Sequence, residues 1–281
     1  MRVHQLLPAL LAVGAALLIA GGTVLRQRAS AVFGRITASW WLGAAIALTG
    51  FGLQAGALAV GTLLLVQPLL VLAVLFALPL EAWADHRHPS RGEWMWGVLL
   101  AASVALFLVA AAPSPTDARP NHVILAGTIS VVIVVLIGLV VIGEWSSAHY
   151  RSLSYGLVSG TFFGVSALLV KSVLYQVLHY PAVVLTRPEV YLFIVAAVGG
   201  VLAQQRAFSA GELQTSFPAM IVMEPTVSML LGMALLGERV RVTSWQAVFV
   251  VAILVVLVRA VVELAKLSAI RGDQQAGELV R

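Results

Sequence analysis

The sequence predicts an all-α fold, a polytopic membrane bundle of about nine transmembrane helices. Of the 281 residues, 60% are hydrophobic and only 10% are charged, whereas a soluble domain carries about 25% charged residues. The mean hydropathy is +1.00. Several apolar runs are about 20 residues long, which suits membrane-spanning helices and not the short alternating strands of outer-membrane barrels.

Nine apolar runs are expected to cross the membrane. They cover residues 6–24, 40–60, 62–80, 94–112, 123–142, 153–177, 190–207, 213–236 and 245–262. The first run is too long for the apolar core of a signal peptide, so we expect it to remain as a span. The second and third spans are joined by so short a turn that they must form an antiparallel pair. The segment after Val262 is too polar to cross.

The charges in the loops predict the orientation. The net charge is +5, and the basic residues are scattered over the loops rather than gathered on one face, which does not suit nucleic-acid binding. The set of loops that includes the C-terminal segment carries most of the arginine and lysine. The positive-inside rule therefore places the C-terminus in the cytoplasm and the N-terminus outside. We expect a multi-pass protein of the bacterial plasma membrane, in contact with membrane lipid.

Residue types and motifs that the sequence lacks exclude or disfavour several functions. The chain has no cysteine, which excludes disulfides, thiolate metal sites and cysteine nucleophiles. It has no GxxxxGK[ST] phosphate loop, which excludes ATP hydrolysis by that route. We find no serine, histidine and acid arranged on the spans as a hydrolase would need. The sequence therefore predicts a protein that is not an enzyme and that carries no cofactor or metal.

The stretch 212–238 is the most informative part of the chain, because it places an acid and a proline inside an apolar run. Glu224 and Pro225 lie near the middle of the eighth span. A central acidic residue costs roughly 2.5–3.5 kcal/mol in a membrane helix, so we expect Glu224 to bind a substrate, a proton or a cation. Pro225 and Pro218 each remove a helical hydrogen bond. We expect both to break the helix, because discontinuous helices often build transporter sites.

The two halves of the chain share a pattern. In one register, Gln67 and Pro68 in the third span correspond to Glu224 and Pro225 in the eighth, and each pair is followed at the same separation by a glutamate. In a second register, which the sequence leaves equally open, Gly61 and Pro68 correspond to Gly211 and Pro218. We expect Pro68 to break its helix as well. A five-span unit and its copy are inverted in the membrane, with the binding site at their interface. We divide the chain into a first five-helix repeat at 1–145, a second, four-helix repeat at 146–265 and a polar cytoplasmic tail at 266–281.

Proline-then-acid patterns run from Pro68 to Glu81 and from Pro225 to Glu238, and Lys171 ends the sixth span. With these features and its Gln205-Arg206 turn, the chain resembles the drug/metabolite transporter superfamily in its EamA-like branch. The span count and the glutamine-rich turns are also similar to NIPA-type magnesium transporters of the same superfamily. The resemblance implies two inverted repeats that work by alternating access. The chain departs from the pattern in lacking a tenth span.

Other polar residues on the spans are candidates for contact with a substrate. Lys171 is expected either to pair with Glu224 or to receive an anionic substrate group, and the alternative is that it snorkels to the interface. Gln54, Gln67 and Gln205 are expected to exchange hydrogen bonds with a substrate or to join helices to one another. An amide in lipid must find a partner in one of these ways.

Glycines and loop acids complete the set of candidates. Gly156, Gly160 and Gly164 form a GxxxGxxxG series on one face of the sixth span. Such a series is typical of close helix packing, either between the repeats or between the two copies of a homodimer. Glu81 and Glu238 lie just outside their spans, and we expect them to be solvated loop acids.

Three functions remain open from the sequence. The favoured hypothesis is a secondary active transporter, an exporter of a small metabolite or drug-like solute that is coupled to protons through Glu224. The second is a permease for magnesium or another cation of the NIPA type. A single intramembrane carboxylate weighs against it, although magnesium is held by as few as one or two carboxylates. The third is a non-transporting membrane subunit or lipid carrier that supports an envelope enzyme.

Overall fold

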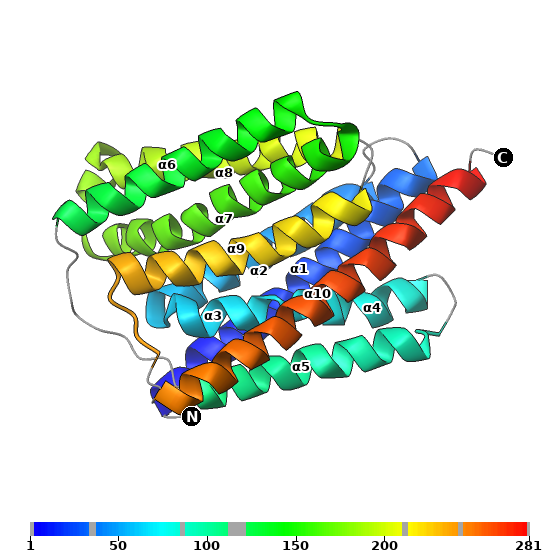
Figure 1. Ribbon diagram of the computed structural model, residues 1–281, viewed down its shortest axis with the longest axis horizontal. Coiled ribbons are helices and arrows are strands. Elements are labelled where there is room, and N and C mark those ends of the chain that lie inside the picture. Colours follow the sequence, from blue (N-terminus) through cyan, green and yellow to red (C-terminus); the bar gives the residue numbers. More distant parts are fainter. Residues whose placement is uncertain are drawn as a thin grey trace. The chain divides into compact units, whose positions relative to one another are not determined.

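The computed structural model describes residues 3–33, 38–84, 88–111, 122–209, 213–240 and 244–279. Within these ranges the chain is helical apart from short turns and connections, and nine stretches are long and apolar enough to cross a membrane. The predicted all-α membrane bundle is therefore confirmed (Figure 1). The chain is an integral membrane protein.

The helices group into two compact units, and each unit is assembled from separate parts of the chain. Unit 1 comprises Met1–Gly61, Pro68–Ala111 and Val242–Arg281, and unit 2 comprises Thr62–Gln67 and Ala112–Arg241. These units differ from the predicted repeats at 1–145 and 146–265. The helix that ends at Trp145 groups with the residues after it, and the last helix groups with the first part of the chain. The boundaries of the compact units therefore differ from those of the predicted repeats.

Unit 1 is built from α1 (Val3–Phe33), α2 (Ala38–Val60), α4 (Leu72–Ala84), α5 (Arg91–Ala111) and α10 (Ser244–Leu279). Helices α1 and α2 approach closely at a glycine, because a Cβ on Gly22 would lie 2.5 Å from the backbone nitrogen of Ala47. Helix α5 begins with a capping box, in which the side chains of Ser90 and Glu93 each accept the other's backbone N–H. Helix α10 packs on α5 and α4.

Unit 2 is built from the start of α3 (Leu63–Leu70), α6 (His122–Trp145), α7 (Ala148–His179), the 3-10 helix η1 (Pro181–Thr186), α8 (Pro188–Ser209) and α9 (Leu213–Leu235). Helix α7 is central, because α6, α8 and α9 all pack on it. Buried hydroxyls join α7 to α8. Ser152 donates to the Ala207 carbonyl at 3.3 Å, and Ser159 donates to the Gly200 carbonyl at 2.9 Å. Such bonds help membrane helices to associate, since lipid provides no hydrophobic drive.

Helices α7 and α9 approach each other along the glycine series. A Cβ added to Gly156 would lie 2.6 Å from the Ser216 carbonyl oxygen, and one added to Gly164 would lie 2.7 Å from the Cβ of Val227. Gly160, between them, is equally close to α9. These separations leave no room for a side chain. The contacts advance along both helices together, so α7 and α9 run parallel within unit 2.

Pro218 and Pro225 do not act as the sequence predicts, whereas the prediction for Pro68 agrees with the structure. Helix α9 is continuous through both Pro218 and Pro225, so the prediction that they break it is wrong. Neighbouring helices can hold a proline-containing span helical, and α9 is held against α7 on both sides of Pro225. The interruption lies instead in the third span, where α3 ends at Leu70 and α4 begins at Leu72. It follows Pro68 by less than one turn.

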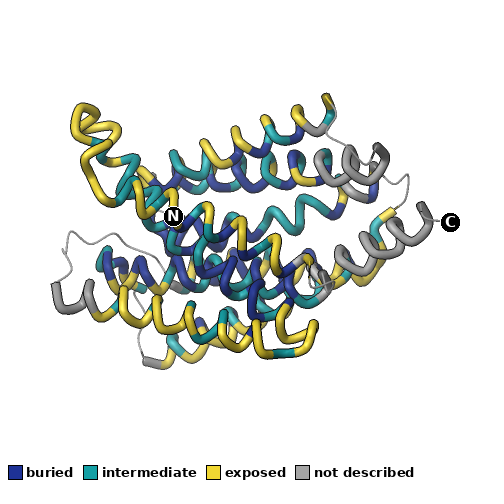
Figure 2. The backbone as a smooth tube through the Cα atoms, turned by 90° about the horizontal axis from the view of Figure 1, so that it is seen from above, coloured by how far each residue is buried: buried dark blue, intermediate teal, exposed yellow. Residues whose placement is uncertain are grey.

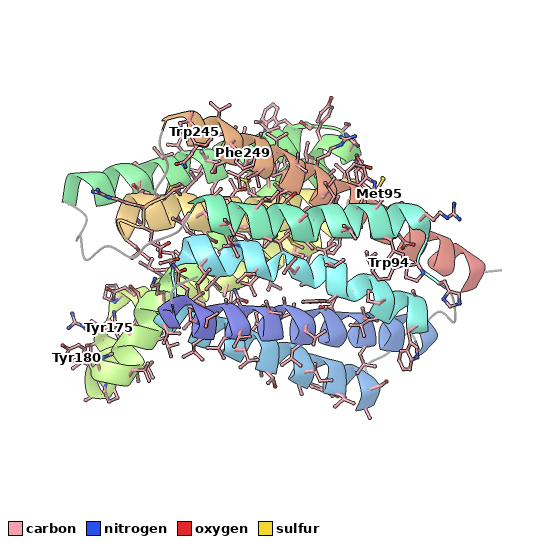
Figure 3. All side chains as sticks on the ribbon, turned by 90° about the horizontal axis from the view of Figure 1, so that it is seen from below. Trp94, Met95, Tyr175, Tyr180, Trp245 and Phe249 are labelled. Atoms are coloured by element: carbon pink, nitrogen blue, oxygen red, sulfur yellow. The ribbon has the colours of Figure 1, made fainter. Side chains whose placement is uncertain are left out.

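The outer faces of the helices are exposed, as expected for surfaces that contact lipid. Along most of the longer helices, buried positions alternate with exposed ones (Figure 2). Among the candidate spans of the described residues, α6 is the least buried. Of its most apolar 18-residue stretch, 6% is buried, against 22% or more in each of the other spans. In unit 1, Trp94 and Trp245 point outward near the starts of their spans (Figure 3). Tryptophan is enriched at such positions because it suits the membrane interface.

Gly160→Ala is expected to destabilise the protein, whereas Gly138→Ala is not. A methyl group at Gly160 would overlap α9, and overpacking typically costs about 1–3 kcal/mol. A Cβ on Gly138 in α6 meets no atom within 4 Å, and alanine is the better helix former by about 1 kcal/mol. Thermal unfolding of both variants in detergent tests this difference. Equal unfolding temperatures would contradict the close α7–α9 crossing.

Candidate functional site

Glu224 lies where α7 and α9 cross. Its backbone nitrogen would lie 3.1 Å from a Cβ on Gly160, and its carbonyl oxygen would lie 2.8 Å from a Cβ on Gly164. The two glycines therefore fix the depth of Glu224 along α7. Its side chain is half-buried. Of the residues that the structure describes, none donates a hydrogen bond to its carboxylate or forms an ion pair with it.

The Glu224 side chain lies between the face of α9 that contacts α7 and the face that contacts α3. Met223 faces α7, because its Cβ would lie 2.6 Å from a Cβ on Gly160. Gly232 faces α3, because a Cβ there would lie 3.2 Å from the Cβ of Leu63. Successive residues of an α-helix are about 100° apart. Glu224 therefore points between α7 and the first turn of α3.

Polar groups surround the crossing near Glu224. The Ser228 hydroxyl donates to the Glu224 carbonyl at 2.7 Å and to the Gly164 carbonyl at 3.3 Å, which links α9 to α7 one turn beyond the acid. Pro225 has no N–H, so the Ile221 carbonyl lacks its usual helical donor. The arrangement is rich in acceptors. It suits a proton, a cation or a solute group that donates hydrogen bonds.

The first turn of α3 is capped by an acid from beyond the end of α9. The Glu238 carboxylate accepts the backbone N–H groups of Leu63 at 2.9 Å and Leu64 at 3.0 Å. The Thr62 hydroxyl accepts the N–H of Leu65 at 3.2 Å. The first three N–H groups of α3 are thereby satisfied. The negative charge also lies at the positive end of the helix dipole.

The C-terminus of α9 directs Glu238 towards α3. Gly237 has a φ of 63°, in the left-handed region that favours glycine. The Glu238 N–H donates to the Gly232 carbonyl at 3.1 Å, a bond that spans one residue more than the six-to-one bond of a Schellman motif. The chain thus folds back, and a Cβ on Gly232 would lie 2.9 Å from the Glu238 carboxylate. Glycine at position 232 leaves space for that carboxylate.

Lys171 pairs with Glu238 and not with Glu224 as one prediction had it. Its Nζ lies 3.1 Å from the Glu238 carboxylate, and the lysine side chain is 25% exposed against 2% for the glutamate. Lys171 lies about two turns beyond Gly164 on α7, which brings it to the end of α9 and past the level of Glu224. We call Glu238, Lys171 and the first turn of α3 (residues 62–65) the Glu238 latch.

Gln67 is buried in α3, one turn after Leu63. It lies on the same face as Leu63 and is 1% exposed. Its Nε2 has no hydrogen-bond acceptor among the described residues, and an unsatisfied buried donor costs about 1–3 kcal/mol. Helix α3 starts at the C-terminal end of α9 and runs in the opposite direction (Figure 1). Four residues rise about 6 Å, so Gln67 lies near the level of Ser228.

Neither of the other two glutamines belongs to this cluster within unit 2. Gln54 lies in α2 of unit 1. Gln205 belongs to unit 2 but is exposed on α8. Its neighbour Gln204 turns inward and donates to the Met220 sulfur at 3.3 Å. Among the predicted substrate contacts, Glu224, Gln67 and Lys171 are therefore the ones that lie within the interior of unit 2.

Sequence reasoning missed the role of Glu238. The prediction of a solvated loop acid is wrong, because Glu238 is 3% exposed and capped onto α3. One local signal was present, since Gly237 at the end of a span is typical of a cap that folds the next residue back. The partners lie 175 and 174 residues away in the chain, so no local pattern could identify them. The side chain of Glu81 lies outside the described residues.

Comparison with known proteins gives a relative but no activity. An uncharacterized protein of Corynebacterium glutamicum is 33% identical over 278 residues, which cover 94% of this chain and 96% of the relative. No protein-family model matches the chain, and no solved structure is significantly similar to it. The relative covers both compact units, so the cluster in unit 2 lies inside the matched region.

Glu238→Ala is expected to loosen the first turn of α3. The substitution leaves two buried N–H groups without acceptors, at about 1–3 kcal/mol each, whereas Glu238→Gln keeps one acceptor and should cost less. The effect is measured as the hydrogen-exchange rate of a peptide spanning residues 62–70, and this rate should be higher in the alanine variant. Arg206→Ala is the control, because its ion pair with Glu144 is exposed and such pairs contribute little. Equal exchange in all three variants would contradict the latch.

Proposed function

This chain belongs to the same protein family as that Corynebacterium glutamicum protein, and we propose that it is a secondary active transporter of the bacterial plasma membrane. In this proposal it exports a small metabolite or drug-like solute by alternating access. Glu224 binds the solute or the proton that drives its movement. The resemblance to the drug/metabolite transporter superfamily belongs to the same proposal, as does the absence of an enzymatic activity.

The observation that carries the proposal is the state of Glu224. Its carboxylate is half-buried inside a candidate span, and no described residue pairs with it. An ionisable group at that depth is costly and by default marks a functional site. Of the two cations on α7, Lys171 is paired with Glu238 and Arg151 bonds the carbonyls of Gly143 and Glu144. The charge of Glu224 is therefore left to be neutralised by something that arrives from outside the protein.

A proton and a solute can exchange at such a site. When a proton or a cationic group binds, the carboxylate becomes neutral overall and the cost of burying it falls. When the ligand leaves, the cost returns, so occupancy and conformation are coupled. The interruption of the third span next to Gln67 provides the discontinuous helix that transporter sites commonly contain. These features support transport more directly than a purely structural role for the acid.

Glu224→Gln is expected to reduce solute flux by about tenfold or more. The amide keeps the size of the side chain but loses charge-assisted hydrogen bonds of about 1.5–3 kcal/mol, and 1.4 kcal/mol corresponds to a factor of ten. Metabolite profiling of a deletion strain identifies the solute, and its flux is then measured in proteoliposomes. The matched control is Glu144→Gln, because Glu144 lies at the exposed end of α6 in the same unit.

The outcomes separate the three functional hypotheses. Flux that Glu224→Gln leaves unchanged would contradict the proposed role of the acid. Magnesium uptake that is independent of any other solute would support a cation permease. The absence of flux in every assay, together with a partner that copurifies with the protein, would support a non-transporting subunit.

A further inference from the structure

One short segment belongs to unit 2 although the chain on both sides of it belongs to unit 1. Thr62–Gln67 is assigned to unit 2, whereas Gly61 and Pro68 are assigned to unit 1. The described contacts that hold this segment within unit 2 are those of the Glu238 latch and the close approach of Gly232 to Leu63. These polar contacts lie at the first turn of the segment, and the segment as a whole is buried from Thr62 to Gln67.

The chain is interrupted at both ends of this segment. Helix α2 ends at Val60, just before it, and α3 gives way to α4 at Val71, just after it. Pro68 has no N–H, so the Leu64 carbonyl has no helical donor four residues on. The first turns of α3 can move without the breaking of a long helix. Hinges of this kind, at the ends of elements, absorb conformational change in many proteins.

The latched arrangement also contains an unsatisfied group. Gln67 is 1% exposed, and its Nε2 finds no acceptor in the part of the chain that the structure describes. Movement of α3 away from α9 would give this donor access to water or to a solute. The latch therefore holds in place a segment that carries an unsatisfied buried donor.

We propose that the Glu238 latch is a gate at one end of the Glu224 site. This inference rests on the proposed function, because a gate has a purpose only if a solute reaches Glu224. When the latch is closed, Leu63 of α3 lies against Gly232 of α9, one turn beyond Ser228 on the same side of that helix. When Glu238 releases Leu63 and Leu64, the first turns of α3 leave α9, and Glu224 opens to the side of the membrane on which Glu238 lies.

The lack of cysteine in the chain permits a direct test without any solute. Ser228→Cys introduces one thiol at a position that is 0% exposed in the latched structure. The rate at which a membrane-impermeant thiosulfonate reagent modifies it, in proteoliposomes, reports how often the gate opens. We expect Glu238→Ala to raise this rate about tenfold or more and Lys171→Met to raise it by a smaller factor, because the backbone N–H groups keep their acceptor.

Ser152→Cys is the matched control for the thiol. Ser152 is also a 0% exposed serine bonded to a carbonyl of a neighbouring helix, but it lies in the first turns of α7, far along that helix from Lys171. A gate raises the rate at position 228 alone. Equal acceleration at both positions would mean general loosening of unit 2 and would overturn the proposal, as would an unchanged rate at position 228.

The test stays decisive if Glu238→Ala does not fold. Lys171→Met and Glu238→Gln then provide the comparison, and an unchanged rate at position 228 in both would overturn the gate. The result is also independent of the transport assay. If the labelling rate at position 228 does not change but flux still depends on Glu224, the gate is refuted and the proposed function stands. If the rate rises but no solute is transported, the proposed function is refuted and the opening of α3 stands.

Discussion

Three glycines of α7 allow α9 to lie directly against it, and the positions of Glu224 and Ser228 depend on that contact. Lipid gives membrane helices no hydrophobic reason to associate, so they rely on close packing and hydrogen bonds. Here the backbone of α9 meets α7 at Gly156, Gly160 and Gly164. Glu224 is thereby held at the crossing, and Ser228 reaches across to α7. The same contact keeps α9 helical through its two prolines.

Two acids of unit 2, Glu238 and Glu224, have opposite surroundings. Glu238 receives two backbone N–H groups and an ammonium group, so its charge is compensated within the protein. Glu224 receives nothing from the described residues. A compensated acid holds parts of a structure together, whereas an uncompensated acid remains available to a ligand. This contrast is why we assign the gate to Glu238 and the binding of solute or proton to Glu224.

The sequence was sufficient for the fold class, because hydropathy and run length determine which segments can span a bilayer. The glycine spacing also indicated a close crossing, although it could not say that α9 was the partner. Pro218 and Pro225 were misjudged because the effect of a proline on a membrane helix depends on what packs around it. Glu238 was misjudged because its partners are distant in the chain. Hydrogen bonds such as that from Leu63 depend on tertiary structure and leave no mark on local composition.

The central claim is that Glu224 is a carboxyl group that takes up and loses a proton inside the bundle. Infrared difference spectroscopy of the protein in lipid, recorded as the pH is changed, tests it most directly. The account predicts a carboxyl C=O band that changes with pH in the wild type and is absent from Glu224→Gln. Identical difference spectra for the two proteins would contradict it, because they would show that Glu224 does not titrate.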